Sequence, residues 1–387
     1  MSLELDEHRE YLADQARIGA FRRAIAEVVR PGDVVLDLGA GTGILGLLAC
    51  RAGAKRVYSI DEGGMIELAR EVCQANHFQD RVVFIKGLST RVDLPEKVDL
   101  ILADQIGHFG FEAGLLEYFS DARTRFLKPD GTTIPSRVDL YVVPVEHQEI
   151  WNQIEFWNDA PGGFDFRPAR ALAAHTGYPV KFTPDHLLGD PLSPVSLDPS
   201  SPSSTPVKFD VAITANRVGT LHGIGGWFSA QLSNKVALSN SPLVAQRINR
   251  RNAFFPIDQP VHLEKGDQIR IMMHILQKET VITWTVEVRE NQDISQGQSH
   301  SPRKARFTHS TLKGMLISQE DLQRTKPDYR PALSPWGIAR LTVLSLCDGK
   351  RPLAEIEWDV LRRHPTLFGS LGEAQTFVAE VVTRYSL

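Results

Sequence analysis

The stretch from Val34 to Leu45 constrains this chain more than any other. It reads VVLDLGAGTGIL, an apolar run interrupted by Asp37 and followed by three glycines at alternate positions. The apolar run predicts a short buried strand. The glycines predict a sharp turn that opens a helix near Ile44, because glycine lets the backbone turn tightly and approach a ligand closely. A strand, a glycine turn and a helix N-terminus in this order are typical of a nucleotide-type cofactor site.

The spacing of the glycines argues against a dinucleotide. Gly39, Gly41 and Gly43 are evenly spaced, whereas the dinucleotide fingerprint has two residues between its second and third glycine. Asp37 stands just before the turn, where it would repel a pyrophosphate but not a cation. S-adenosylmethionine carries a sulfonium and an ammonium, so this acidic form of the motif, with Ala40 inside the turn, favours that cofactor over NAD.

The next predicted strand, residues 56–60, supports the same cofactor. It ends at Asp61 and Glu62, and Asp61 follows the middle glycine by 20 residues. An acidic residue at this distance, at the tip of the second strand, is placed to accept hydrogen bonds from a ribose diol. The alternative is a solvated strand end.

Strands and helices alternate along the first third of the chain. Helical spacing of apolar residues predicts a helix over 8–29, and the elements predicted after it are 34–38, 44–52, 56–60, 64–76, 82–86, 98–103 and 113–126. This alternation predicts an open, mostly parallel sheet with helices on both faces, which binds ligands at the carboxyl ends of its strands. Gly41, Asp61, Ser89 and Asp104 fall at such ends and are expected to converge on one crevice.

The pattern changes after residue 131. Alternation typical of antiparallel strands with one wet face covers 138–145, 207–214, 260–264, 268–275 and 281–289. The remaining segments are a partly helical, aromatic-rich stretch at 150–190, a Pro/Ser loop at 190–206, a polar linker at 290–305 and three tail helices that begin near residue 336. We therefore predict an α/β Rossmann-like domain over 1–136, an antiparallel β-barrel domain over 137–325 and a small helical C-terminal module over 326–387.

Composition limits the class of protein. A chain of 387 residues is expected to form two or three domains. Its polar, acidic beginning lacks a secretory signal, no stretch resembles a membrane span, and three scattered cysteines are too few for a disulfide framework or a zinc site. The net charge of −4 does not indicate the basic face that nucleic-acid binding needs. The basic segment 247–251 is expected to be a solvated loop. These features predict a cytoplasmic protein without metal, nucleic acid or membrane partner.

From His8 to about residue 285 the chain resembles the protein arginine methyltransferases. The resemblance rests on VVLDLGAGTGILGLLACRAGAKRVYSID, FIKGLSTRVDLP and RFLKPDGTTIPSRVDLYV, which follow one another in the family's order and with similar spacing. It implies that the strand-rich region after Pro135 is the family's β-barrel. It also implies that residues 150–190 contain its dimerisation arm, so the protein is expected to be a homodimer.

The resemblance also assigns cofactor-binding roles. Arg17, in HREYLADQAR, would bind the cofactor carboxylate, and Asp37 with the three glycines would frame the methionine part. Asp61 would accept from the ribose hydroxyls. Ser89 and Thr90 would flank the adenine, although the family usually has a glutamate at the second of these positions.

The resemblance fails where the acceptor would bind. The family has two glutamates in a hairpin loop that clamp a guanidinium, whereas this chain has ADQIGHFGFEA from Ala103 to Ala113. Asp104 matches the first glutamate but is one methylene shorter, and the second position falls on Ala113, with Glu112 one residue early. The family's threonine-histidine-tryptophan loop is replaced by Ile248-Asn249-Arg250. A guanidinium needs two aligned acceptors, so the donor side looks intact and the arginine side rebuilt.

Three residues are candidates for the chemistry. Asp104 could orient the acceptor or accept its proton, His108 could act as a general base near neutral pH, and Glu112 could supply a second carboxylate. The corresponding structural alternatives are a loop cap, an ordinary half-buried histidine and a favourable helix N-terminal charge.

We predict an S-adenosylmethionine-dependent methyltransferase that acts on a side-chain nitrogen of a peptide or protein. Methylation of a natural-product amine or hydroxyl is one alternative, and a catalytically silent subunit that binds cofactor or peptide is another. The tail sequence LTVLSLCDGKRPLAEIEWDVLRRH weakly resembles the small winged-helix peptide-binding domains of ribosomal-peptide and pyrroloquinoline-quinone biosynthesis. A helical extension that only packs on the barrel is the alternative for this segment.

Overall fold

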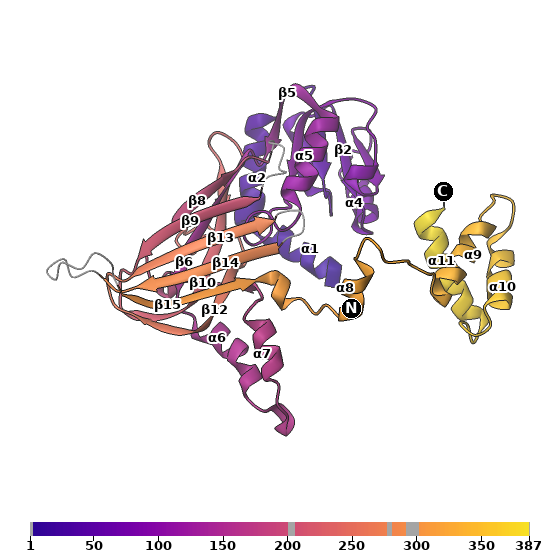
Figure 1. Ribbon diagram of the computed structural model, residues 1–387. Coiled ribbons are helices and arrows are strands. Elements are labelled where there is room, and N and C mark those ends of the chain that lie inside the picture. Colours follow the sequence, from indigo (N-terminus) through magenta and orange to yellow (C-terminus); the bar gives the residue numbers. More distant parts are fainter. Residues whose placement is uncertain (1–2, 200–205, 277–280, 292–301, 387) are drawn as a thin grey trace. The chain divides into compact units, whose positions relative to one another are not determined.

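The computed structural model describes residues 3–199, 206–276, 281–291 and 302–386 (Figure 1). The chain divides into two compact units, Met1–Met315 and Leu316–Leu387. The first unit contains both of the larger predicted regions, and one hydrophobic core runs through them. The second unit has a core of its own and begins ahead of the predicted module.

A parallel sheet forms the first half of unit one. Its strands are β1 (Val34–Leu38), β2 (Arg56–Asp61), β3 (Val82–Lys86), β4 (Val98–Ala103) and β5 (Leu127–Ile134). They lie in the order β3-β2-β1-β4-β5, and every neighbouring pair is parallel. Parallel strands need crossover connections, which here contain α3 (Ile44–Ala52), α4 (Met65–Ala75), the short helix η1 (Ser89–Arg91) and α5 (Leu115–Phe126). The predicted Rossmann-like sheet is confirmed.

The helix predicted over 8–29 is two helices. α1 (Leu3–Ala13) and α2 (Gln15–Val28) are separated at Asp14, whose backbone is extended. The Asp14 carboxylate caps α2 by accepting a hydrogen bond from the Arg17 backbone N–H at 3.1 Å. Apolar spacing continues across the break, but an aspartate that bonds a nearby N–H favours a helix start over a helix interior.

Two antiparallel sheets form the second half of unit one. The first has the order β7-β12-β10-β6-β8, with β11 paired to β10, and the second has the order β15-β14-β13-β9. Their strands are β6 (Arg137–Val145), β7 (Tyr178–Val180), β8 (Leu192–Leu197), β9 (Val207–Thr214), β10 (Gly219–Gln231), β11 (Ala237–Ser239), β12 (Asn252–Leu263), β13 (Gln268–Leu276), β14 (Val281–Arg289) and β15 (Arg303–Ser310). A hydrogen bond of 2.7 Å from Trp284 Nε1 to the Pro256 carbonyl joins β14 to β12. The predicted antiparallel architecture is confirmed.

Strand β10 was absent from the prediction because its glycines remove the usual strand signal. The side chains that pack against these glycines explain why the strand has glycine there. A Cβ at Gly226 would lie 2.6 Å from Cε2 of Phe109, and one at Gly225 would lie 2.8 Å from Cγ1 of Val145. Glycine here marks close packing of large side chains onto the backbone, which a propensity argument reads as a loop.

Three segment predictions need correction. The predicted Pro/Ser loop contains β8, the predicted linker contains the start of β15, and the strand predicted at 260–264 is the end of the longer β12. Each error comes from weighing local polarity over the hydrogen bonds that a neighbouring strand offers. Residues 200–205 and 292–301 of the two predicted loops lie outside the described residues.

The aromatic-rich stretch forms α6 (Gln148–Glu155), the short helices η2 (Phe156–Asn158) and η3 (Pro161–Gly163), and α7 (Arg167–Ala173). Helices α6 and α7 project beyond the antiparallel strands (Figure 1). Phe164, in the connection between η3 and α7, is 70% exposed, and Phe156 is 47% exposed.

The second unit is helical in its described residues. It contains α8 (Gln319–Arg324), α9 (Pro335–Leu346), α10 (Leu353–Arg363) and α11 (Leu371–Tyr385). The turn predicted at Cys347-Asp348-Gly349 is present, and Asp348 Oδ1 accepts hydrogen bonds from the backbone N–H groups of Lys350 and Arg351. Across the described part of the chain, no helix combines the length and apolarity that membrane crossing needs.

Candidate functional site

The glycine turn between β1 and α3 is built on left-handed backbone. Gly39 has φ of 64° and Gly41 has φ of 52°, which a residue with a side chain rarely adopts. The backbone N–H of Gly41 donates to Asp61 Oδ2 at 2.8 Å. A Cβ at Gly41 would lie 2.6 Å from Cε1 of His8, so glycine also makes room for α1 to cover the turn.

Asp37 lies behind the turn. Its residue surface is 1% exposed, and its Oδ2 accepts from the Gly46 N–H in the first turn of α3 at 3.0 Å. Its Oδ1 is buried without a hydrogen-bond partner. Burial raises the pKa of Asp37 to about 7, against the opposing hydrogen bond from Gly46. Asp37 therefore supports the turn, and it is not among the side chains that line the adjacent cavity.

Asp61 ends β2 next to the turn. Besides the bond from Gly41, its Oδ1 accepts from the Gly63 N–H at 2.7 Å. Glu62 beside it is exposed. Ser89 and Thr90 lie in η1 after β3, where Ser89 is buried and its carbonyl accepts from Arg125. The predicted strand-end residues are thus at the carboxyl edge of the sheet, but Glu62, Ser89 and Thr90 do not line the cavity described next.

A cavity of about 460 Å³ opens in front of the glycine turn. It brings together four of the predicted site residues, Arg17, Asp104, His108 and Glu112, with the turn. Its polar or charged lining also includes His8, Tyr11, Thr42, Gln105 and Arg250. Gly39, Ala40 and Gly41 form its backbone wall. Ligands of open α/β sheets bind at this edge, beyond the carboxyl ends of the strands. The predicted convergence of strand ends therefore holds for Gly41 and Asp104, with Asp61 joined through its bond to Gly41.

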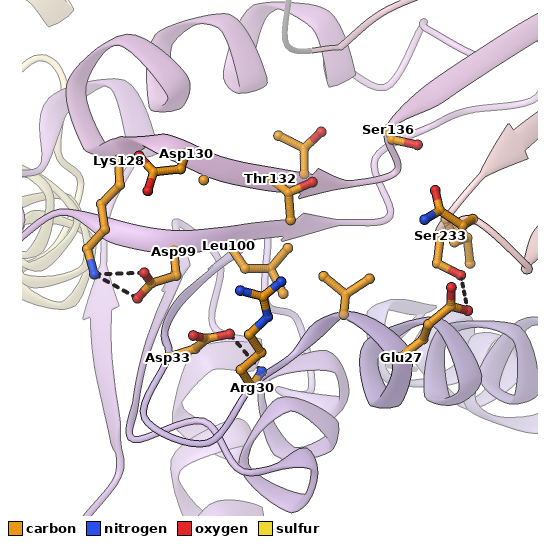
Figure 2. Close-up of a pocket in the computed structure, with 15 residues that line it drawn as sticks. Glu27, Arg30, Asp33, Asp99, Leu100, Lys128, Asp130, Thr132, Ser136 and Ser233 are labelled. Atoms are coloured by element: carbon orange, nitrogen blue, oxygen red, sulfur yellow. Dashed lines mark hydrogen bonds and ion pairs between the residues drawn. The ribbon is translucent and has the colours of Figure 1, made fainter.

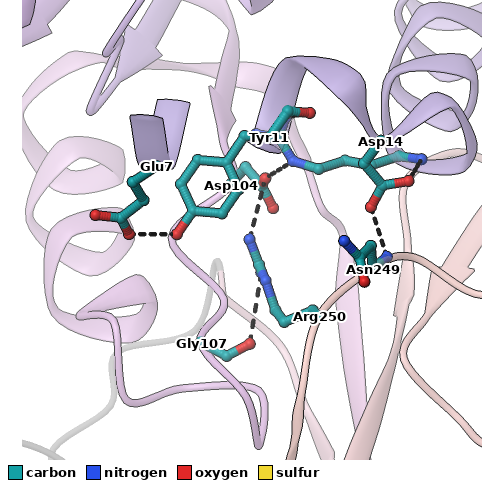
Figure 3. A network of polar contacts seen from close by, with 8 residues as sticks. Glu7, Tyr11, Asp14, Asp104, Gly107, Asn249 and Arg250 are labelled. Carbon is teal, nitrogen blue, oxygen red and sulfur yellow. Dashed lines mark hydrogen bonds and ion pairs between the residues drawn. The ribbon is translucent and has the colours of Figure 1, made fainter. Parts of the chain in front are cut away.

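Two arginines share one oxygen of Asp104 (Figure 3). Arg17 Nε donates to Asp104 Oδ2, and Arg250 Nη2 lies 3.4 Å from the same oxygen. All three side chains are about nine-tenths buried, at 10%, 11% and 7% exposure for Arg17, Arg250 and Asp104. Asp104 Oδ1 is buried and has no hydrogen-bond partner. A buried carboxylate oxygen without a donor indicates a ligand group or proton that completes it.

Tyr11 lies against the same arginines. Its ring centroid is 5.3 Å from Cζ of Arg17 and 5.9 Å from Cζ of Arg250. Its hydroxyl donates to Glu7 Oε1 at 2.7 Å. Burial and this hydrogen bond raise the pKa of Tyr11 to about 12, so the phenol keeps its proton and offers an aromatic face instead of a base.

Glu112 has its carboxylate turned toward its own loop. Its Oε1 accepts from the backbone N–H groups of His108 and Phe109, and its Oε2 accepts from the N–H of Phe111 at 3.2 Å. Gly107 makes this possible, since a Cβ there would lie 2.5 Å from the Glu112 carboxyl carbon. His108 Nδ1 lies 3.2 Å from the Arg251 carbonyl oxygen. Asp104 and Glu112, the acids nearest to the family's two glutamates in sequence, therefore do not form an aligned pair of carboxylates. Glu112 instead holds its own loop in place.

Sequence reasoning missed four residues that line the cavity: His8, Tyr11, Gln105 and Arg250. Gln105 follows Asp104 directly and packs on Gly39, with its Oε1 buried and unpaired. Arg250 belongs to the segment expected to be a solvated loop. That expectation is wrong for two of its arginines, because Arg250 is buried on Asp104 and Arg247 donates to the Phe182 carbonyl at 2.9 Å.

A second cavity, of about 440 Å³, lies at the opposite edge of the parallel sheet (Figure 2). Three of its charged residues lie at the amino ends of the strands, where Asp33 precedes β1, Asp99 is the second residue of β4 and Lys128 is the second residue of β5. Lys128 Nζ lies 2.8 Å from both oxygens of Asp99. Although burial opposes it, this pairing lowers the pKa of Asp99. The Lys128–Asp99 ion pair joins β5 to β4 at the edge opposite to the one where such sheets bind ligands.

Two family models match the chain. Residues 22–138 match the ribosomal protein L11 methyltransferase family, and residues 136–294 match the arginine methyltransferase oligomerization subdomain. The two matches meet where the parallel sheet gives way to the antiparallel strands. A glycine turn at the carboxyl edge of a parallel sheet, joined to such a subdomain, defines a Rossmann-like methyltransferase.

Relatives with known names fix the family. Protein arginine N-methyltransferase 1 of Schizosaccharomyces pombe is 31% identical over 276 residues, which is 68% of this chain and 79% of the relative. Protein arginine N-methyltransferase 1 of Dictyostelium discoideum is 30% identical over 271 residues, with the same coverage of both chains. The chain belongs to the protein arginine N-methyltransferase family and is an S-adenosylmethionine-dependent methyltransferase.

Solved structures show the same fold. Protein arginine methyltransferase 10 of Arabidopsis thaliana aligns with a TM-score of 0.68 at 23% identity, covering 79% of this chain and 98% of that chain. The enzyme–prozyme complex of Trypanosoma brucei protein arginine methyltransferase 1 aligns with a TM-score of 0.67, covering 78% of this chain and 97% of that chain. In both cases the length of the aligned part is close to the length of unit one.

Proposed function

We propose that this enzyme transfers the methyl group of S-adenosylmethionine to a side-chain nitrogen of a peptide or protein, with Asp104 as the residue that contacts the acceptor. The observation that carries this proposal is the unpaired, buried Oδ1 of Asp104 in the cavity beside the glycine turn. The relatives at about 30% identity, which are named for protein substrates, support the acceptor class.

The residues present fit the cofactor. Gly39, Ala40 and Gly41 line the cavity as a wall of backbone, and Gln105 has a second buried, unpaired oxygen beside them. We propose that Arg17 binds the cofactor carboxylate, that Gly39, Ala40, Gly41 and Gly43 surround its methionine part, and that Asp61 accepts from its ribose. Ser89 and Thr90 would flank the adenine beyond the end of β3. The predicted direct role for Asp37 becomes a supporting one, because its carboxylate lies behind the turn.

When bound, the cofactor supplies an electrophilic methyl carbon on a sulfonium. Transfer from it is an in-line displacement, so the protein contributes mainly position and charge. Asp104 Oδ1 would accept a hydrogen bond from an N–H of the acceptor group and so orient the reacting nitrogen toward the methyl group. Glu112 would fix the loop that carries Asp104, and His108 lies at its surface side with Nδ1 directed at a backbone carbonyl.

Methyl transfer from labelled S-adenosylmethionine into proteins and peptides of a cell extract tests the proposal. Asp104→Ala is expected to lower the incorporation rate by about 100-fold, because the acceptor loses Asp104 Oδ1, the buried carboxylate oxygen without a donor among the described residues that line the cavity. Cofactor affinity, measured by calorimetry, is expected to stay within about threefold of the wild type, because Arg17 is released from Asp104 and remains free to bind the cofactor.

Asp80→Ala is the matched control, since Asp80 is exposed on the connection between α4 and β3. It should change neither quantity. A wild-type protein that binds the cofactor but labels nothing in the extract would instead indicate a silent subunit. Label that appears only in small molecules would indicate the natural-product alternative.

We further propose that the protein forms a homodimer through the projection that carries Phe164. A largely aliphatic cavity of about 900 Å³ lies over α1, α3 and α4, and its lining includes Leu12, Ile44, Leu47, Leu68 and Val72. An exposed aromatic on one surface and an aliphatic cavity on another suit a closed two-fold pair, in which each copy supplies both. The match of residues 136–294 to an oligomerization subdomain supports this proposal.

Sedimentation equilibrium tests the dimer. Phe164→Asp and Leu68→Asp are each expected to produce monomers, because either change places a charge in the same proposed contact. Phe156→Asp, at another exposed position of the projection, is the control. A dimer that survives both substitutions would contradict the proposal.

A further inference from the structure

Arg250 lines the cavity beside Asp104, the residue that we propose contacts the acceptor. It lies in the segment between β11 and β12, and its guanidinium is 11% exposed. Its Nη1 lies 3.5 Å from the Gly107 carbonyl oxygen, and its Nη2 lies 3.4 Å from Asp104 Oδ2 (Figure 3). A loop carbonyl, a carboxylate and the Tyr11 face therefore fix the guanidinium on the acceptor side.

No pair of carboxylates is left for a second guanidinium. Among the described residues that line the cavity, Asp104 and Glu112 are the carboxylates. Glu112 accepts three backbone N–H groups of its own loop, and Asp104 Oδ2 is shared by Arg17 and Arg250. After Arg17 turns to the cofactor, Arg250 still contacts Asp104 Oδ2 and Oδ1 is the oxygen of this carboxylate without a donor. An incoming guanidinium, which needs two aligned acceptors for a bidentate contact, would have to share one carboxylate that already holds a cation.

The charges of the cavity point the same way. Two arginines and two carboxylates line it, so their formal charges sum to zero. If Arg17 turns to the cofactor carboxylate, Asp104 and Arg250 remain as a neutral pair. An incoming guanidinium or ammonium would add a cation beside Arg250 and beside the sulfonium of the donor. In a buried site that repulsion is weakly screened.

We infer that Arg250 determines acceptor specificity, excluding guanidinium and ammonium groups in favour of an uncharged imidazole nitrogen. The inference rests on the proposed function and names its acceptor. A guanidinium is protonated at any working pH and has no free lone pair, whereas neutral imidazole has one nitrogen with a lone pair and one with a proton.

The transfer balances with the groups present. The N–H of the imidazole donates to Asp104 Oδ1, and the lone pair of the other ring nitrogen forms the new N–C bond. The C–S bond breaks and its electron pair stays on sulfur, which becomes an uncharged thioether. The methylated ring carries a positive charge until its N–H proton passes to Asp104 or to solvent. Arg250 keeps its bond to Asp104 Oδ2 and orients the carboxylate throughout, which makes it a positioning residue.

Two peptides that differ at one position, His or Arg, test the inference against the wild type and Arg250→Gln. Peptide binding is measured by fluorescence anisotropy with S-adenosylhomocysteine present, which allows binding without reaction. Methylation is measured by mass spectrometry with S-adenosylmethionine. The wild type is expected to bind the His peptide at least about tenfold more tightly than the Arg peptide, and Arg250→Gln is expected to remove this preference.

Arg251→Gln is the matched control, because Arg251 is the exposed neighbour on the same segment. It should keep the wild-type preference. Arg250→Lys retains the cation and should also keep it, which preserves the comparison if Arg250→Gln does not fold by circular dichroism.

Equal or tighter binding of the Arg peptide by the wild type overturns the inference, as does a preference that Arg250→Gln leaves unchanged. Methylation of the Arg peptide by the wild type would support the proposed function and reject this inference. Methylation of neither peptide counts against the proposed function, and the binding preference then decides the role of Arg250. Binding of neither peptide rejects the imidazole acceptor.

Discussion

The side of the cavity that we propose for the donor, at the glycine turn, and the side that we propose for the acceptor, at Asp104, are built in different ways. On the donor side, backbone N–H groups of the turn and of α3 donate to carboxylates of the adjacent strands, from Gly41 to Asp61 and from Gly46 to Asp37. On the acceptor side, Asp104 pairs with Arg17 at a separation of 87 residues and with Arg250 at a separation of 146. The difference teaches that a site formed by the backbone of a turn depends on a local sequence motif such as the glycine turn. A site formed by side chains from distant segments can change without disturbing the sheet.

The largest expected effect concerns the buried acid behind the donor turn. Because burial raises the pKa of Asp37 in the folded protein to about 7 from 3.8, its contribution to stability is present below about pH 4 and is lost as pH rises through about 7. Asp37→Asn removes this loss. The free energy of unfolding of the variant should exceed that of the wild type at pH 8 by on the order of 4 kcal/mol and should match it at pH 4.

Urea unfolding of both proteins between pH 4 and pH 8 measures this difference. Asp130→Asn, at an exposed position on β5, is the control and should follow the wild type at every pH. A difference between Asp37→Asn and the wild type that does not change with pH would mean that Asp37 keeps an ordinary pKa.

The next prediction tests whether the backbone of the glycine turn is what binds the donor. Gly41→Ala is expected to weaken cofactor binding by about 100-fold, because φ of 52° disfavours a side chain and the new Cβ would meet His8. Gly64→Ala is the matched control, since Gly64 has an ordinary helical φ of −70° and open space around its Cβ position. Calorimetry with S-adenosylhomocysteine measures both. Similar losses in the two variants would show that the turn has no special role.

A smaller effect separates the two neighbouring acids at the end of β2. Asp61→Ala is expected to lower cofactor affinity about tenfold, because the variant loses the proposed ribose contact and the acceptor of the Gly41 and Gly63 N–H groups. Glu62→Ala should leave affinity within about twofold of the wild type, since Glu62 is exposed and does not line the cavity. The opposite ranking in the same titration would exchange the two assignments.

The smallest effect tests whether Glu112 is part of the chemistry. Glu112→Gln keeps one oxygen for the N–H groups of His108 and Phe109 and loses the acceptor of the Phe111 N–H. We expect the rate of methyl transfer to fall by no more than about threefold, against a loss of about 100-fold for Asp104→Asn. A loss of rate in Glu112→Gln as large as that in Asp104→Asn, measured under the same conditions, would indicate that both acids take part in the chemistry.

Much of the parallel sheet and its cofactor edge could be predicted because each signal lies within a short stretch. The strand that ends at Leu38, the glycines after it and Asp61 are each local patterns with a fixed spacing. Strand β10 could not be predicted, since its glycines are explained by Phe109 and Val145, which come from other elements. The break at Asp14 was missed for a related reason, because a cap and a helix interior can share the same apolar spacing.

The sequence by itself therefore determined the family, the cofactor class and the strand edge at which we propose that the cofactor binds. The tertiary structure alone decided which charges meet in the cavity. It placed Arg250 on Asp104, turned Glu112 into its own loop and put Asp37 behind the turn. The physical reason is that the conformation of a turn depends on residues next to one another, whereas the pairing and burial of a charge depend on which distant segments the fold brings together.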